Sequence, residues 1–217
     1  MDIEHARYNM VEQQIRTWDV LDPAVLALLT ELPRERFVPP DMQALAFADL
    51  DLPIGHEEVM LAPKMQARIA QELALAPTDT VLEIGTGTGY LTALLARLAA
   101  SVTSIEIHAD FAEGARARLA GLGIDNTRIE VGDAARGWSG GGPYDAIVLT
   151  GSVPMLPDVF QKSLRHGGRL FAIVGEAPMM SARLISRASD TAFTAVTLFE
   201  TVVPPLVNAQ RPSRFVF

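Results

Sequence analysis

The chain of 217 residues contains no cysteine. Disulfide bonds, thiolate metal sites and a cysteine nucleophile are therefore excluded. The N-terminus is polar and charged, unlike the apolar stretch of a signal peptide, and together with the lack of cysteine this predicts a cytoplasmic protein. Because no apolar run approaches the length of a membrane span, no membrane partner is expected.

Basic charge is also scarce. The chain has 18 Lys and Arg residues against 26 Asp and Glu residues, and its formal net charge is -8. Its lysines are Lys64 and Lys162, and no cluster of basic residues occurs. Proteins that bind nucleic acid usually present a basic face to the phosphates, so no nucleic-acid partner is expected.

Histidine is rare as well. The four residues, His5, His56, His108 and His166, lack the spacing of metal ligands, so no metal site is expected. We expect three of them at the surface. His56 is a candidate for acid–base work, because imidazole titrates near neutral pH.

What the chain does contain is a regular alternation of strand and helix patterns from residue 63 onward. Such alternation with short loops predicts one α/β domain with a mostly parallel sheet and helices on both faces. Two runs near the C-terminus have no helix between them and predict an antiparallel end to the sheet. The expected strands are 80–84, 102–107, 128–131, 144–150, 168–174, 181–187 and 194–203, and the expected helices are 64–75, 90–99, 109–122 and 155–164.

The first 63 residues follow another pattern. Helices are expected at 10–15 and 22–32, the second with Asp22 as its N-cap. Residues 37–55 are rich in Pro, Asp and short apolar pieces and predict an irregular arm over the main domain. We therefore expect one folded unit with two parts, an N-terminal helical arm with its substrate loop (1–63) and a main domain (64–217).

A glycine-rich loop follows the first strand of the main domain. It reads Gly85-Thr86-Gly87-Thr88-Gly89, and a helix is expected from Tyr90. Glycines let a ligand approach the backbone closely, and the start of a helix offers unpaired N–H groups. A dinucleotide fingerprint would read G-x-G-x-x-G. Here the third glycine comes one position early, and Glu83 lies where its charge would repel a pyrophosphate.

This E-x-G-x-G-x-G form resembles the first motif of class I methyltransferases that use S-adenosylmethionine (SAM). The next strand ends at Glu106, where a carboxylate can accept the ribose hydroxyls. The strand after it ends just before Asp133, which resembles the adenine-binding position of that family. The predicted cofactor is SAM, with S-adenosylhomocysteine (SAH) as its product. The predicted cofactor-binding residues are Glu83, Gly85, Thr86, Gly87, Thr88, Gly89, Tyr90, Glu106, Ile107, Asp133 and Ala134.

The wider sequence resembles the protein-L-isoaspartate O-methyltransferase family over almost its whole length. The blocks LPRERFVP (32–39) and LPIG (52–55) are specific to that family. The resemblance implies a Rossmann-like fold, methyl transfer from SAM to the α-carboxylate of an isoaspartyl residue, and a C-terminal segment that closes the substrate side. Further matching segments are MVEQQIR (10–16), VLEIGTGTGYLTALLA (81–96), GD (132–133), GW (137–138), PYDAIVLT (143–150), GGRLFAIVG (167–175) and VPPL (203–206).

One segment departs from that family. After P-I-G the family commonly carries G-Q-T-I-S-x-P, whose Thr and Ser hydroxyls contact the substrate carboxylate. In this chain Val59 and Leu61 occupy the Thr and Ser positions, and Glu57 and Glu58 replace the Gly and Gln. Hydrogen bonds worth about 1–3 kcal/mol each are lost, and the added carboxylates oppose an anionic acceptor.

This departure leaves three interpretations open. The chain is an isoaspartyl methyltransferase with weak or altered activity, a methyltransferase for a different acceptor, or a SAM-binding sensor without catalysis. In the second case Glu57, Glu58 or His56 would act as the base or bind a cation. We expect a monomer whose acceptor is a peptide, a protein or a small molecule.

Overall fold

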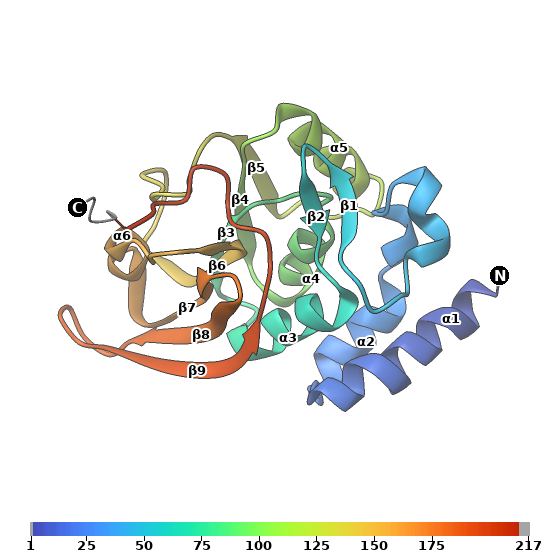
Figure 1. The fold of residues 1–217 in the computed structure, drawn as a ribbon, viewed down its shortest axis with the longest axis horizontal. Coiled ribbons are helices and arrows are strands. Elements are labelled where there is room, and N and C mark those ends of the chain that lie inside the picture. The colour runs from blue at the N-terminus through green and yellow to red at the C-terminus, as the bar shows by residue number, and fades with distance from the viewer. Residues whose placement is uncertain (1, 213–217) are drawn as a thin grey trace.

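A seven-stranded sheet forms the centre of the computed structural model, which describes residues 2–212 (Figure 1). Its order is β5-β4-β3-β6-β7-β8-β9. The pairs from β5 to β7 are parallel, whereas β8 pairs antiparallel with both β7 and β9. This confirms the predicted fold class, including its antiparallel end. The strands are β3 (Thr80–Ile84), β4 (Ser101–Glu106), β5 (Thr127–Val131), β6 (Tyr144–Val153), β7 (Leu164–Glu176), β8 (Met179–Arg187) and β9 (Phe193–Thr201).

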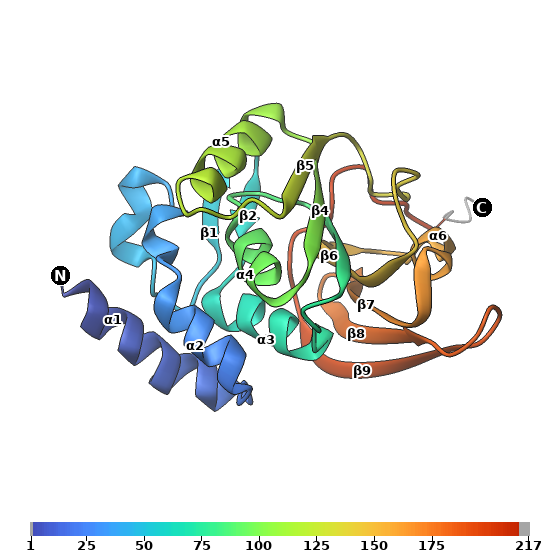
Figure 2. The same ribbon diagram turned by 180° about the vertical axis from the view of Figure 1, so that it is seen from behind.

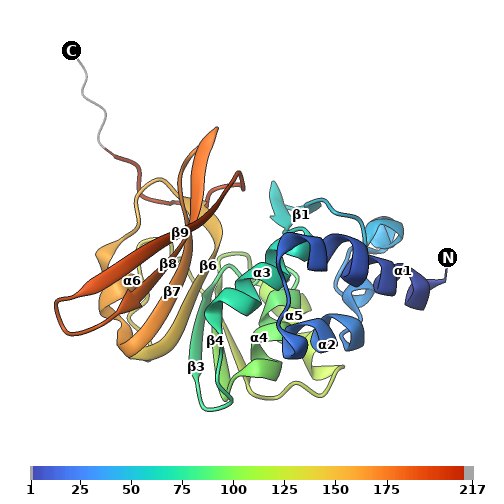
Figure 3. The same ribbon diagram turned by 90° about the horizontal axis from the view of Figure 1, so that it is seen from below.

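The helices cover the two faces of the sheet unequally. Five of them, α1 to α5, gather on one side, and α6 lies on the other (Figure 3). Figure 2 shows α4 and α5 against β4 and β5. The second face is completed by partly buried residues such as Trp138 and Leu206. The helices are α1 (Ile3–Asn9), α2 (Pro23–Glu31), α3 (Pro63–Leu73), α4 (Tyr90–Leu98), α5 (Ala109–Ala120) and α6 (Asp158–Lys162).

Helix α6 is shorter than the expected helix over 155–164. It begins only at Asp158, because Pro157 disfavours helical backbone at the residue before it. It ends at Lys162 because β7 already begins at Leu164. The sequence pattern therefore predicted the right element with the wrong bounds.

The first helix of the N-terminal arm begins earlier than the sequence predicts. Helix α1 precedes a π-helical segment, η1 (Met10–Ile15), and a short 3-10 turn, η2 (Arg16–Trp18). Helix α2 begins at the predicted cap, where Asp22 Oδ1 accepts hydrogen bonds from the N–H groups of Ala24 and Val25.

Residues 37–60 are more ordered than expected. The segment holds a short 3-10 helix, η4 (Pro40–Leu45), and an antiparallel hairpin of β1 (Leu52–Gly55) with β2 (Glu58–Met60). This hairpin forms a sheet of its own beside the main one. Its turn residues His56 and Glu57 adopt positive φ angles of 51° and 63°, which is unusual for residues other than glycine. The expected irregular arm is therefore wrong for the part that approaches the cofactor loop.

The arm and the main domain share one core. A single cluster of buried side chains contains Leu29 of α2 and Phe37 together with Leu94 of α4 and Val148 of β6. Apolar surface of the arm is thus buried against the sheet, which holds the hairpin in position over the strand ends. Within residues 2–212, no helix has the length and apolar character needed to cross a membrane.

Candidate functional site

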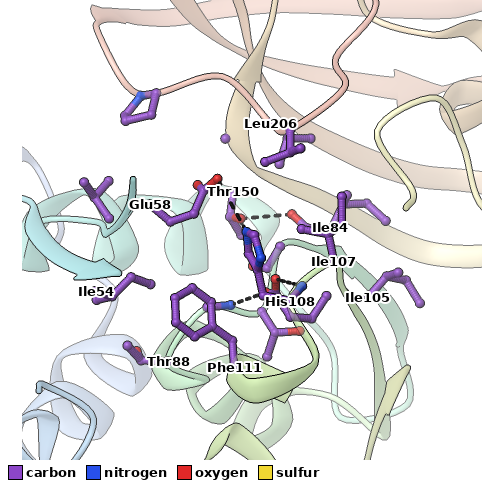
Figure 4. Close-up of a pocket in the computed structure, with 18 of the residues that line it drawn as sticks. Ile54, Glu58, Ile84, Thr88, Ile105, Ile107, His108, Phe111, Thr150 and Leu206 are labelled. Atoms are coloured by element: carbon purple, nitrogen blue, oxygen red, sulfur yellow. Dashed lines mark hydrogen bonds and ion pairs between the residues drawn. The ribbon is translucent and has the colours of Figure 1, made fainter. Parts of the chain in front are cut away.

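A cavity lies at the carboxyl ends of the parallel strands (Figure 4). Its walls come from the β1–β2 hairpin, the loop after β3, the ends of β4, β5 and β6, and residues 204–207. About 860 Å³ of empty space, open solvent at the mouth included, lies between these walls. Open α/β sheets bind their ligands at this edge.

Most of the predicted cofactor residues meet in this cavity. Gly85, Thr86, Gly87, Thr88, Glu106, Ile107, Asp133 and Ala134 line it, whereas Glu83, Gly89 and Tyr90 lie behind its wall. Three strands therefore contribute to one site, with the acidic residues Glu106 and Asp133 in its wall and Glu83 outside it.

The glycines of the loop are required by their surroundings. Gly85, Gly87 and Gly89 have φ angles of 94°, 53° and 88°. A Cβ at Gly85 would collide with the hydroxyl of Thr150, and one at Gly89 would lie 3.0 Å from the Cβ of Ala115. The loop therefore keeps a narrow backbone path between β6 and α5 that other residues would block.

Glu106 connects the end of β4 to the loop. Its Oε2 accepts a hydrogen bond of 2.7 Å from the Gly87 N–H, and its Oε1 accepts one of 3.0 Å from the His108 N–H. The side chain is buried but lines the cavity, so the carboxylate is held in one orientation beside any bound ligand. A fixed carboxylate of this kind is suited to accept a pair of ribose hydroxyls.

Glu83 supports the loop from inside the protein. It is fully buried, and its Oε2 accepts hydrogen bonds from Thr92 Oγ1 at 2.5 Å and from Ser104 Oγ at 2.7 Å. Burial raises the pKa of Glu83 to about 7. Its Oε1 has no hydrogen-bond partner among the described residues. Direct contact between Glu83 and the amino-acid end of the cofactor stays a prediction.

Arg34, from the segment 32–39, makes buried contacts with several parts of the fold, among them Tyr90. The Arg34 guanidinium lies 5.0 Å from the centre of the buried Tyr90 ring, and burial lowers the pKa of Arg34 to about 10. It donates hydrogen bonds to the carbonyls of Ala46 and Leu61 and to the Gln66 side chain. Arg34 therefore ties the backbone at Ala46 and Leu61 to helices α3 and α4. The sequence pattern did not reveal this role.

Asp133 lies at the opposite end of the cavity, after β5. Its Oδ1 accepts a hydrogen bond from the Ala135 N–H, and its Oδ2 accepts one of 2.8 Å from Asn208 Nδ2. The C-terminal segment is fixed further by reciprocal backbone bonds, from Ser152 to Pro204 and from Leu206 to Ser152, each 2.9 Å. This segment thus forms part of the cavity wall. That it closes the substrate side stays a prediction.

The residues of the divergent segment separate into two groups. Glu58, Val59 and Leu61 line the cavity, so the two positions without hydroxyls do face the site. His56 and Glu57 lie in the hairpin turn and line a second, outer hollow. Four residues belong to the walls of both spaces, namely Glu58, Pro204, Leu206 and Val207.

His108 is a site residue that sequence reasoning placed at the surface, and that expectation is wrong. Its ring stacks on that of His56 with centroids 4.1 Å apart. Its Nε2 lies 4.0 Å from Glu58 Oε1 (Figure 4). Phe111 packs edge-on against both rings. The position of His108 two residues after Glu106 was the one signal that it lies near the cofactor.

The described residues contain no group of three or more His, Cys, Asp or Glu side chains arranged to hold a metal ion. The polar groups of the cavity are instead backbone N–H groups, carboxylates, hydroxyls, the Gln66 carboxamide and one imidazole. Such a set is suited to bind an organic cofactor with hydroxyl, amino and carboxylate groups.

Known proteins resemble this chain over most of its length. A family profile described as protein-L-isoaspartate(D-aspartate) O-methyltransferase (PCMT) matches residues 5–211. Protein-L-isoaspartate O-methyltransferase 1 of Rhodopseudomonas palustris (strain HaA2) is 45% identical over 179 residues, covering 82% of this chain and 73% of the relative. A protein-L-isoaspartate O-methyltransferase of R. palustris (strain ATCC BAA-98 / CGA009) is 38% identical over 203 residues, covering 93% of each chain.

Two solved structures share the fold. One, a protein-L-isoaspartate O-methyltransferase, superposes with a TM-score of 0.78 at 25% identity. The superposition covers 92% of this chain and 65% of the solved one. The other, from Plasmodium falciparum and in complex with SAH, superposes with a TM-score of 0.78 at 19% identity, covering 95% of this chain and 98% of that one.

Proposed function

The chain belongs to the protein-L-isoaspartate(D-aspartate) O-methyltransferase family, and from this premise we propose that it transfers a methyl group from SAM to the α-carboxylate of isoaspartyl residues in peptides or proteins. One observation carries the proposal. The loop 85–88, Glu106 and Asp133 line one cavity, and this cavity shares a wall with an outer hollow that could receive a polypeptide.

The cofactor supplies an activated methyl group, and the residues of the cavity bind and orient it. We assign the N–H groups of the loop to its amino-acid end, Glu106 to the ribose hydroxyls, and Asp133 with the Ala134 N–H to the adenine. The glycines that keep the loop narrow and the fixed Glu106 carboxylate both fit such a molecule.

The acceptor carboxylate is itself the nucleophile, because carboxylates are ionised near neutral pH. Catalysis therefore needs little acid–base help and consists mainly of holding one carboxylate oxygen in line with the methyl carbon and the departing sulfur. The apolar residues Pro204, Leu206 and Val207 border the place where the two reactants meet and would exclude water from it.

We further propose that the protein acts in the cytoplasm as a monomer, with no nucleic-acid or membrane partner. The absence of cysteine and the net charge of -8 support this part of the proposal.

A methyl-transfer assay tests the activity directly. Labelled SAM is supplied with an isoaspartyl peptide and, as a control, with the same peptide containing an ordinary aspartyl residue. We expect transfer to the isoaspartyl peptide alone, and a fall in SAM affinity of about tenfold or more for Glu106→Ala, since a buried charged hydrogen-bond partner is lost. The exposed Glu113 offers the matched control Glu113→Ala. Failure to bind SAM, or equal effects of both substitutions, would contradict the cofactor assignment.

A different acceptor is the second candidate, and one observation favours it. The wall that faces the acceptor carries Glu58 in place of neutral hydrogen-bond donors, and Val59 and Leu61 add none. Transfer to an amine or hydroxyl compound, with SAM binding intact and both peptides unreactive, would establish this alternative.

A further inference from the structure

The cofactor cavity and the outer hollow adjoin at a border formed by Glu58, Pro204, Leu206 and Val207, the four residues that line both spaces, and this border is called the passage below. A methyl group that leaves the cavity for an acceptor in the outer hollow must cross this passage. Glu58 is the one ionisable residue of the four, and its side chain is 28% exposed. The acceptor atom therefore arrives beside the Glu58 carboxyl group.

An ionised Glu58 would oppose a carboxylate acceptor. Two carboxylates at one site repel each other, and such pairs commonly keep one proton between them. The neighbouring wall residues Val59 and Leu61 offer no hydrogen bond that would offset the repulsion. A protonated Glu58, by contrast, has an O–H group that can donate to a carboxylate oxygen.

The surroundings of Glu58 make the uptake of a proton easier than it is for a carboxylate in water. His56 and Glu57 belong to the same hairpin, Glu106 and His108 come from the end of β4 and the loop after it, and residues 204–207 of the C-terminal segment carry no charge. Burial raises the pKa of Glu58, and the nearby Glu106 and Glu57 raise it further, whereas His108 and His56 act in the opposite direction. His108 is the nearest group that can exchange a proton with Glu58, since its Nε2 lies 4.0 Å away.

We propose that Glu58 determines acceptor specificity by taking up a proton when a carboxylate enters the passage and by donating it in a hydrogen bond to one carboxylate oxygen. The inference rests on the proposed function. The second carboxylate oxygen forms the new bond to the methyl carbon, the carbon–sulfur bond breaks with its electron pair going to sulfur, and the proton stays on Glu58. The hydrogen-bond donor that the family draws from Thr and Ser side chains is thereby supplied by a carboxylic acid.

Calorimetry measures this proton directly. An isoaspartyl peptide is titrated into the SAH-loaded protein near pH 7.5, in two buffers of different ionisation enthalpy. We expect the wild type to take up close to one proton per peptide bound and Glu58→Gln to take up close to none, because the amide donates a hydrogen bond without titrating. The matching peptide with a neutral isoasparaginyl residue should cause no proton uptake in either protein.

The pH dependence of turnover gives a second readout. For the wild type, kcat/KM on the isoaspartyl peptide should fall by about tenfold per pH unit once the pH exceeds the pKa of Glu58, because the protonated form is lost. For Glu58→Gln the profile should be flat over the same range. Glu57→Gln is the matched control, since it removes the same charge from the next residue, which lines only the outer hollow.

Five outcomes would overturn the inference. Proton uptake that persists in Glu58→Gln, or equal changes in Glu57→Gln and Glu58→Gln, would mean that Glu58 does not hold the proton. Activity that rises with pH in the wild type and disappears in Glu58→Gln would make Glu58 a base instead. If the peptide neither binds nor reacts in either protein while SAH still binds, the proposed acceptor is wrong as well, whereas binding without proton uptake defeats the inference alone.

Discussion

The donor half and the acceptor half of the cavity are built from different parts of the fold. The donor half consists of the loop 85–88, Glu106 and Asp133, which follow strands of the central sheet. The acceptor half consists of the small β1–β2 hairpin, His108 and residues 204–207, which lie outside that sheet. The comparison teaches that binding of the methyl donor depends on the architecture of the sheet, whereas the choice of acceptor depends on segments packed against it.

Arg34→Met should produce the largest change in stability, and it tests how firmly the acceptor half is held. The substitution leaves the carbonyls of Ala46 and Leu61 and the side chain of Gln66 without their buried donor. We expect a loss of about 3–5 kcal/mol in the free energy of unfolding. Chemical denaturation measures it, with Arg128→Met, whose side chain is 77% exposed, as the control. Equal losses in both variants would show that Arg34 is not an anchor.

Glu83 should make the donor half sensitive to pH. Its pKa is raised to about 7 from 4.5, so the folded state binds a proton that the unfolded state releases. The stabilisation is complete below about pH 4.5 and is lost as the pH rises through about 7, at most about 3 kcal/mol in all. Denaturation curves from pH 5 to pH 8 should therefore show a decline that Glu83→Gln removes and the exposed-site control Glu113→Gln retains. Parallel curves for all three proteins would contradict the assignment.

Gly85→Ala should damage the donor half more locally. The new Cβ meets the Thr150 hydroxyl at a φ of +94°, so we expect a loss of about 2 kcal/mol beyond backbone strain and weaker SAM binding. Gly123→Ala is the matched control, because Gly123 also has a positive φ but has no atom within 4 Å of its Cβ position. SAM titration and thermal unfolding of both variants separate the effect of the steric clash from that of backbone strain. Equal loss of SAM affinity in both variants would argue against a close fit of the loop.

The double variant Val59→Thr/Leu61→Ser should have the smallest effect and should act on the acceptor half alone. It restores the hydroxyls that the family carries, so kcat/KM on an isoaspartyl peptide should rise by about tenfold, as one or two new hydrogen bonds allow. SAM affinity should not change, because the donor half is untouched. A wild type that already matches the double variant would show that the missing hydroxyls do not matter.

The donor half could be predicted from the sequence because its signals are local. A short apolar strand, a glycine loop and a helix start follow one another, and parallel strands bring Glu106 and Asp133 to the same edge. The family resemblance also located Val59 and Leu61 correctly in a wall of the site.

The acceptor half was harder to predict because it depends on tertiary contacts. Strands β1 and β2 have only four and three residues, and a proline and non-glycine turn residues with positive φ hide the hairpin in the sequence. His108 enters the site by stacking on a residue 52 positions earlier in the chain, and Arg34 reaches Gln66 across 32 positions. Patterns of residue spacing do not predict contacts between residues so far apart in the chain.

The β1–β2 hairpin also matters for how such an enzyme can evolve. It is a two-stranded sheet of its own, joined to the rest through the buried side chains of Leu52 and Met60 and through the carbonyl of Leu61, which accepts a hydrogen bond from Arg34. Mutations in the exposed or half-buried residues 56–59 can therefore accumulate without disturbing the order of the central strands. The hairpin is accordingly a natural unit for exchange between relatives, by recombination in nature or by grafting in the laboratory.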